Sequence, residues 1–236
     1  MKKLAVLLMV FFISAGLYAQ QVNDPNAEVR QAKGYHGINV SGSFDVYLNQ
    51  SNEEAVAVSA AETKYQQRIK VEVKEGILYI SYNQEGKMSW GNGNKKLKAY
   101  ISCKQIDKLN VSGACDVYIS GILKAENLFI QQSGASDIKG KIDVNKLTVD
   151  LSGASDITIT GTATQLSIEA SGASDFKGFD LVSDICDARA SGASDIKITV
   201  NKELSAHASG ASDVRYKGNG VMRDIKSSGA SSVSRG

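Results

Sequence analysis

Apolar and polar residues alternate along most of the chain with a period of two, the spacing of a strand that buries one face. In one representative segment the apolar positions of a single parity are Leu147, Val149, Leu151, Ile157 and Ile159. β-branched residues dominate such segments, and the three-to-four-residue spacing of an amphipathic helix is absent. The pattern predicts an all-β protein.

A five-residue motif, Ser-Gly-Ala-Ser-Asp, interrupts this alternation at nearly constant intervals. It stands at 133–137, 152–156, 171–175, 191–195 and 209–213, with variant copies at 41–45, 112–116 and 228–232. From Ser112 onward the copies are 18 to 21 residues apart, a period typical of a solenoid whose units stack on their neighbours. A unit of about 19 residues suits one coil, or rung, of a β-helix with strands about 4.8 Å apart. The sequence therefore predicts a right-handed parallel β-helix, since parallel crossovers generally take that hand.

Counting the alternation through the motif assigns its side chains to two sides. Gly153 and Ser155 share the parity of the flanking isoleucines and are expected to point inward. The variant copies support an inward serine position, because Phe44 and Cys115 stand there and both suit burial. The side chains expected to point outward are Ser152, Ala154 and Asp156. The glycines expected where the chain turns a corner are Gly121, Gly140, Gly161 and Gly178.

The last motif position predicts a row of carboxylates on the outer surface, formed by Asp116, Asp137, Asp156, Asp175, Asp195 and Asp213. Stacked like charges about 4.8 Å apart repel by about 1 kcal/mol per pair in water. Two residues further, on the same face, stand Lys139, Thr158, Lys177, Lys197 and Arg215, so a neutralising surface ladder is expected. The alternative is a row of Ca²⁺ sites at Asp137, Asp156, Asp175 and Asp195.

The first third of the chain is less regular. Residues 35–110 are expected to form an N-terminal rung with a β insertion or cap, followed by the repeat solenoid at 111–236 in one continuous domain. Strands are predicted at 54–60, 68–74, 77–82 and 96–102, with a hairpin turn at 74–76 and one or two helical turns at 61–67.

Three aromatic residues are candidate ligand contacts. Trp90 lies in a Gly-, Asn- and Lys-rich loop, where binding residues often collect, although it could instead cover the open end of the solenoid. Tyr47 and Tyr118 stand two residues after the motif aspartates of the first two copies.

The amino terminus predicts export. Two lysines, an apolar run of residues 4–17 and a cleavage site after Ala19 form a secretory signal peptide at 1–19. The run is shorter than the ~20 residues of a membrane span, so no integral membrane segment is expected after cleavage. Residues 20–34 are polar and are expected to form a flexible leader. The expected location is the periplasm, the outer cell surface or the extracellular medium.

Composition excludes several function classes. Without residues 1–19 the chain carries 25 basic and 25 acidic residues, and no basic stripe indicates a nucleic-acid partner. Two histidines and three cysteines among 236 residues cannot build a typical zinc site, and no cofactor is expected. An odd number of cysteines leaves at least one thiol unpaired, and buried, unpaired thiols are favoured for Cys103, Cys115 and Cys186.

The segment of residues 36–48, His-Gly-Ile-Asn-Val-Ser-Gly-Ser-Phe-Asp-Val-Tyr-Leu, followed by the repeats, resembles the head GIN domain family. The likeness covers about residues 35–234. It implies an exported bacterial envelope protein with a β-helix fold, of the kind described as autotransporter adhesins, and it transfers no catalytic or binding residue.

Three functions are compatible with these features. The first is a non-enzymatic binding or adhesion module that presents a rigid surface to a glycan or an envelope protein. The second is a structural or signalling-associated periplasmic scaffold, in which the terminal rung near 228–235 could support end-to-end self-association. The third, a polysaccharide lyase or glycosidase, is disfavoured because the repeated acids occupy equivalent settings and offer no division into acid and base.

Overall fold

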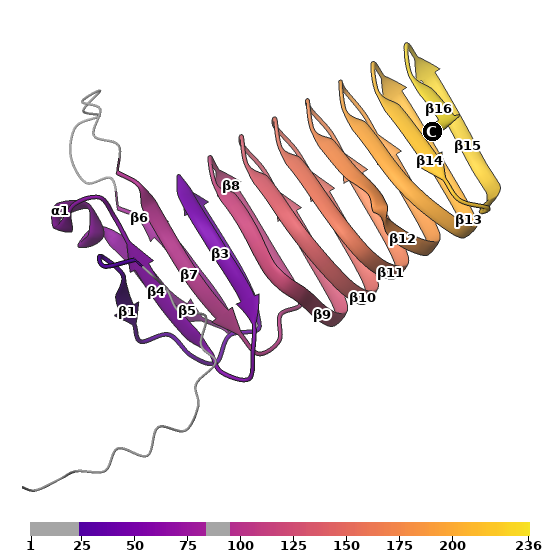
Figure 1. Cartoon of the computed structure of the whole chain (residues 1–236). Helices are drawn as coiled ribbons and strands as arrows, with labels where there is room; N and C mark the ends of the chain where they lie inside the picture. Colours follow the sequence, from indigo (N-terminus) through magenta and orange to yellow (C-terminus); the bar gives the residue numbers. More distant parts are fainter. Residues whose placement is uncertain (1–23, 84–94) are drawn as a thin grey trace, which may run out of the picture.

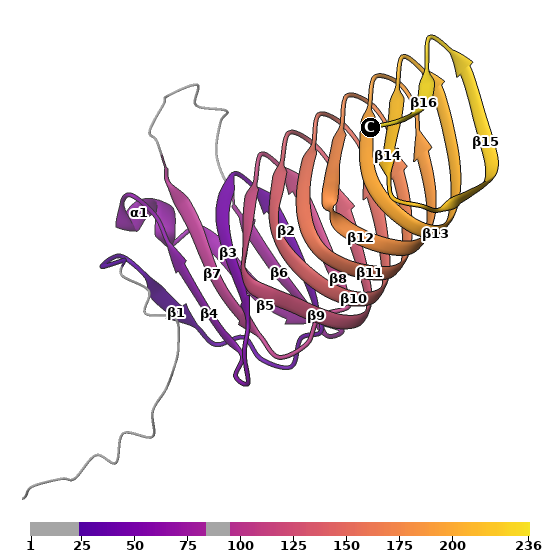
Figure 2. The same ribbon diagram turned by 45° about the vertical axis from the view of Figure 1, so that its right-hand side comes forward.

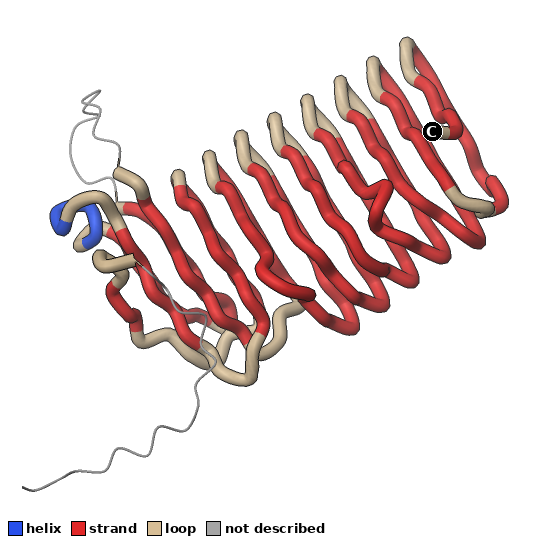
Figure 3. The backbone as a smooth tube through the Cα atoms, in the orientation of Figure 1, coloured by secondary structure: helices blue, strands red, loops and turns tan. Residues whose placement is uncertain are grey.

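The computed structural model describes residues 24–83 and 95–236. In this part of the chain successive strands stack as coils along one axis (Figure 1). Strands pair in parallel from coil to coil, and Asp137 lies beside Asp156, the equivalent residue of the next copy. Figure 3 shows the strands in red and the short turns in tan along one edge of the stack. The predicted parallel β-solenoid with rungs of about 19 residues is confirmed.

Five long strands form the regular part of the solenoid, each bending around nearly one full rung (Figure 2). They are β9 (Asp116–Gln132), β10 (Asp137–Leu151), β11 (Asp156–Ala170), β12 (Asp175–Ala190) and β13 (Asp195–Gly210). The last rung and the start of the next are β14 (Asp213–Lys217), β15 (Val221–Gly229) and β16 (Ser232–Arg235). β13 pairs with β14 on one side of the turns and with β15 on the other. Each rung therefore has two broad faces, which meet at the edge where the turns lie (Figure 3).

The N-terminal third caps this stack. Its elements are β1 (Glu28–Arg30), β2 (Gly37–Gly42), β3 (Phe44–Gln50), β4 (Ala55–Ser59), α1 (Thr63–Gln66), β5 (Ile69–Lys74), β6 (Ile77–Tyr82), β7 (Leu97–Cys103) and β8 (Lys108–Gly113). β2 and β8 extend one face of the solenoid in parallel, whereas β3 and β7 extend the other. Antiparallel partners follow on each face: β5 pairs with β6 on one face, and β4 pairs with β7 on the other. The strands, the helical turn and the hairpin turn expected in this region are all present.

Part of the expected leader belongs to the cap. β1 pairs antiparallel with β4. The backbone N–H of Gly34 donates a 2.7 Å hydrogen bond to the Glu54 carboxylate, and Ala32 is buried. Residues 24–34 are therefore fixed to the cap, contrary to the expectation from their polar composition. The predicted signal peptide at 1–19 lies outside the described residues.

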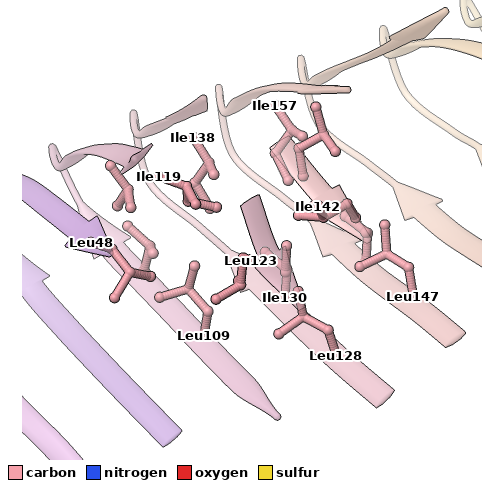
Figure 4. Packing of buried hydrophobic residues seen from close by; sticks show 14 of the residues in the cluster. Leu48, Leu109, Ile119, Leu123, Leu128, Ile130, Ile138, Ile142, Leu147 and Ile157 are labelled. Atoms are coloured by element: carbon pink, nitrogen blue, oxygen red, sulfur yellow. The ribbon is translucent and has the colours of Figure 1, made fainter. Parts of the chain in front are cut away.

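The core is a set of stacked aliphatic columns. In Figure 4 the side chains of Ile119, Ile138 and Ile157, from three successive rungs, point into the interior, as do Leu128 and Leu147. All five are almost inaccessible to solvent. Register places Leu128 beside Leu147 and Ile138 beside Ile157, so equivalent aliphatic side chains pack against one another from rung to rung. Burial of this continuous apolar column holds the rungs together.

Each motif forms a sharp turn and is not a continuous strand. Gly153 is exposed and has a φ of +80°, a left-handed conformation that interrupts the strand alternation. The expectation that Gly153 points inward is wrong for this reason, whereas Ser155 is buried as predicted. Of the glycines expected at corners, Gly121 and Gly161 have positive φ, but Gly140 and Gly178 do not.

The buried serine of each motif closes its turn. The Ser174 hydroxyl donates to the Ser171 carbonyl at 2.9 Å, and Ser212 does the same to Ser209 at 2.8 Å. In the second copy the Cys115 thiol donates to Ser112 at 3.4 Å. The hydroxyl supplies the hydrogen bond that a backbone carbonyl at the corner would otherwise need from water. The motif serine therefore has a structural role. The three cysteines are buried with free thiols, and burial raises the pKa of Cys103 to about 11.

Candidate functional site

The motif aspartates form a continuous row on one of the two broad faces, the one that the chain enters after each turn. We call this face the long face. It is the outer surface of the sheet β7–β3–β9–β10–β11–β12–β13–β14–β16. Strand register places Asp45, Asp116, Asp137, Asp156, Asp175, Asp195 and Asp213 side by side. We call this set the acidic row. Each carboxylate is half-buried. The predicted outward orientation is confirmed.

The neighbouring basic side chains neutralise much of this row. The Lys177 ammonium bridges Asp156 at 2.6 Å and Asp175 at 3.4 Å. Lys139 lies 3.4 Å from Asp137, and Arg215 lies 3.2 Å from Asp213. Such partly exposed pairs contribute little free energy individually, but they offset the repulsion between stacked carboxylates. The long face thus has the compensated ladder that the sequence predicts.

The two ends of the acidic row differ in their electrostatics. Burial, together with Asp137 and Asp45, raises the pKa of Asp116. At the other end the Ser232 hydroxyl, 2.7 Å away, and the Arg215 guanidinium lower the pKa of Asp213. The ionised form is therefore disfavoured at Asp116 and favoured at Asp213.

This difference predicts opposite effects of the same substitution. Asp116→Asn should raise the melting temperature at pH 7, because it removes a charge that the fold disfavours, and Asp213→Asn should lower it. The Asp116 difference should vanish as the pH falls below the ordinary Asp value of 3.8, where this carboxylate is protonated in both the folded and the unfolded chain. The Asp213 difference should vanish only as the pH falls through the lowered pKa of the folded protein. Thermal melts of the two variants at pH 7 and pH 2 test this. Shifts of the same sign at pH 7 would contradict it.

The aspartates suggested as Ca²⁺ ligands are separated by the rung spacing. Within residues 24–83 and 95–236 no three His, Cys, Asp or Glu side chains converge as a metal site would require. Lys177 already occupies the space between Asp156 and Asp175. Cation binding at Asp137, Asp156, Asp175 and Asp195 stays a prediction.

A stack of three tyrosines continues the long face toward the cap. Tyr47 lies between Tyr100 and Tyr118, with ring centroids 5.2 and 5.6 Å apart and rings inclined by 14° and 21°. We call these residues the tyrosine stack. The Tyr100 hydroxyl donates to Asp24 at 2.8 Å, whereas 37% of Tyr118 is exposed. Register then leads from Tyr118 to Lys139, so aromatic and basic side chains form one line beside the acidic row.

Two of the three aromatic candidates thus come together, from β3 and β9. Trp90 lies outside the described residues. Tyr100 was not predicted from the sequence. It stands two residues after Lys98, as Tyr47 stands two residues after Asp45, and Lys98 is in register with Asp45.

A second surface feature lies on the opposite side of the turns. A groove of about 720 Å³ crosses four rungs there, between the side chains of Glu169, Arg189, His207 and Lys226 and those of the motif serines. The sequence analysis did not identify it. The signal was available, because each of the four stands two residues before a motif copy.

Comparison with known proteins identifies the family. The family model described as "Putative auto-transporter adhesin, head GIN domain" matches residues 34–220. The chain belongs to this family. The resemblance found in the motif and the repeats is therefore confirmed, and the adhesin-like description of the family agrees with an exported or surface protein. No curated protein matches the chain.

Solved structures share the head GIN fold. A "putative adhesin" from Bacteroides fragilis NCTC 9343 is 22% identical with a TM-score of 0.81, over 89% of this chain and 95% of that one. A "putative adhesin" from Parabacteroides merdae ATCC 43184 is 16% identical with a TM-score of 0.69, over 89% and 95%. A "putative lipid binding protein" from Parabacteroides distasonis ATCC 8503 is 21% identical with a TM-score of 0.64, over 90% and 98%. At these identities the likeness concerns the fold.

The described part of this head GIN protein contains one helix, α1, of four residues, and it is far too short to cross a bilayer. Within the acidic row, the two aspartates with displaced pKa values, Asp116 and Asp213, are separated by five strand spacings, about 24 Å. They are too far apart to act on one glycosidic bond, for which paired carboxyl groups stand within about 10 Å of each other.

Proposed function

We propose that this protein is an exported, non-enzymatic binding module of the cell envelope, which holds a glycan against the long face at the tyrosine stack. The observation that carries the proposal is the continuity of the line from Tyr100 through Tyr47 and Tyr118 to Lys139, beside the acidic row. The adhesin-like description of the family supports a binding role.

The long face is suited to an extended ligand because its side chains are held at regular intervals. The backbone ladder fixes each residue at one strand spacing, about 4.8 Å, from its equivalent in the next rung. The buried aliphatic columns prevent the rungs from shifting. A ligand therefore meets an ordered surface, and little conformational entropy is lost on the protein side when it binds.

The chemistry of the face matches carbohydrate. Tyrosine rings offer apolar area with a hydroxyl at the rim, and half-buried carboxylates accept hydrogen bonds from sugar hydroxyls. Lys139 and Lys177 supply donors along the same line. The interior is filled by apolar side chains, so the proposal assigns binding to the outer surface.

The test is loss of binding when the stack is removed. The double variant Tyr47→Ala and Tyr118→Ala should weaken binding to the best glycan of an array at least tenfold, because two aromatic contacts of about 1 kcal/mol each are lost. Tyr79→Ala is the matched control, since Tyr79 lies on β6, on the other side of the solenoid. Circular dichroism checks that all variants are folded.

Two outcomes would overturn the proposal. One is equal binding by the double variant and the control, which would place the ligand elsewhere. The other is release of new reducing or unsaturated ends from a bound glycan, which would indicate an enzyme.

A further inference from the structure

One wall of the groove on the other side of the turns consists of long, ionisable side chains. Register places Glu169 beside Arg189, Arg189 beside His207, and His207 beside Lys226. The wall therefore runs along the solenoid axis, with one side chain from each rung. Three of its four members are basic residues, and the single acid stands at one end.

The opposite wall is low and carries hydroxyl groups. It consists of the first motif serines, Ser171, Ser191, Ser209 and Ser228. The Ser171 hydroxyl donates to the Leu151 carbonyl at 3.1 Å, and Ser191 donates to Ala170 at 3.4 Å. With their protons directed at the backbone, these oxygens still have lone pairs to accept hydrogen bonds from a ligand.

The floor of the groove offers no backbone groups for strand pairing. It is formed by buried residues such as Ala170, Ala190 and Ala208, which are paired in the parallel ladder. The adjoining N–H groups of Ser171 and Ser191 donate to the rung before. An extended peptide gains affinity mainly by main-chain hydrogen bonds at a sheet edge, and this floor cannot supply them. A ligand must be recognised through side chains.

The basic residues are paired only at the surface. Arg189 contacts Asp187 at 3.1 Å, and both His207 and Lys226 contact Asp224 at 2.9 Å. These carboxylates lie one outward position away and do not line the groove. About half of the side-chain area is exposed in the Arg189 pair. Such pairs contribute little, so Arg189 and Lys226 can turn toward an anionic group in the groove at small cost.

We propose that the groove binds a linear acidic polysaccharide, with its carboxylate or sulfate groups beside Arg189, His207 and Lys226 and its hydroxyls donating to the serine wall. The groove crosses successive rungs, so a chain lying along the axis meets one basic residue and one serine at each level. Glu169 repels an acidic unit and limits the binding to the rungs of β12, β13 and β15. This site is independent of the proposed glycan contact at the tyrosine stack.

The experiment measures affinity for polygalacturonate oligomers, with heparin oligosaccharides as the sulfate probe, by titration calorimetry at low ionic strength. The double variant Arg189→Gln and Lys226→Gln should bind at least tenfold more weakly, since two charge-assisted contacts are lost. Glu169→Gln should bind more tightly. The matched control is Lys124→Gln with Lys146→Gln, which removes the same charge from exposed lysines outside the groove.

The expected result requires all three variants to fold, as judged by circular dichroism, and the control to bind like the original protein. Equal weakening by the control and the groove variant would overturn the site, because only net charge would then matter. Equal affinity for neutral dextran oligomers would overturn the anionic ligand. Tighter binding of poly-glutamate than of either acidic polysaccharide would overturn the polysaccharide assignment. Loss of binding in the Tyr47 and Tyr118 variant, with unchanged binding in the Arg189 and Lys226 variant, would overturn the groove site and place the acidic polysaccharide on the long face.

Discussion

Replacing Gly172 by alanine is expected to lower the free energy of unfolding by about 3–5 kcal/mol. A Cβ atom at this position would lie 2.4 Å from the carbonyl oxygen of Gly153 in the rung before, and φ is +78°. The left-handed conformation alone costs an alanine about 1–2 kcal/mol. The remainder comes from the clash, because the neighbouring atom is backbone that belongs to the preceding turn and cannot move aside. Urea unfolding followed by circular dichroism measures the loss.

Gly121→Ala is the matched control. Gly121 has nearly the same φ, +75°, but nothing lies within 4 Å of an added Cβ. It should therefore show the conformational cost without the clash, about 1–2 kcal/mol. Equal losses in the two variants would show that the glycines of successive turns are not in close contact.

Phe44→Ser should destabilise the protein by about 3–5 kcal/mol, the usual cost of emptying a buried phenylalanine site. This is unexpected from the repeat, since the change restores the serine found in most copies of the motif. Phe44 is 1% exposed, and its neighbour in β7 is Leu97 rather than another motif residue. The phenyl ring occupies the first position of the serine column, at its cap end.

The comparison for this variant is Cys115→Ser, at the next position of the same column. Its thiol is buried and already donates to the Ser112 carbonyl, as the motif serines do, so the change should alter stability by less than about 1 kcal/mol. Chemical unfolding of both variants under identical conditions decides the matter. A small loss at Phe44 would mean that the cap end of the column is loosely packed.

The architecture could be predicted from the sequence because the repeat supplies two independent constraints. The motif spacing sets the length of a rung, and the parity of residues such as Ile157 and Ile159 sets which side is buried. The acidic row and its basic neighbours followed from the same register. Strand order at the cap did not follow, because β3 and β7 are distant in sequence and no repeat links them.

Two local errors had physical causes. Parity failed at Gly153 because one left-handed residue reverses the alternation, and a sequence pattern does not record φ. Residues 24–34 were expected to be mobile from their polarity, but Tyr100, Glu54 and the edge of β4 hold them. These partners are at least 20 residues away in sequence, so no local pattern could indicate them.

The candidate sites divide in the same way. Tyr47 and Tyr118 could be predicted as members of the tyrosine stack, because each stands two residues after a motif aspartate. Tyr100 could not, because no motif copy precedes it directly. The groove was not predicted, because its ionisable residues precede the motif and differ from copy to copy. Reading the position two residues before each copy shows the change from Asp150 and Glu169 to Arg189, His207 and Lys226.

The unequal ladders between rungs have a mechanical consequence. Hydrogen bonds between rungs point along the solenoid axis. A pulling force applied at the two ends of the solenoid therefore acts on every interface between rungs. β10 and β11 are paired along almost their whole length. β9 meets the preceding rung only through two short stretches, at Asp45–Asn49 and Lys108–Val111. Under tension the cap should separate from the repeats at this junction before β9, β10, β11, β12 and β13 separate from one another.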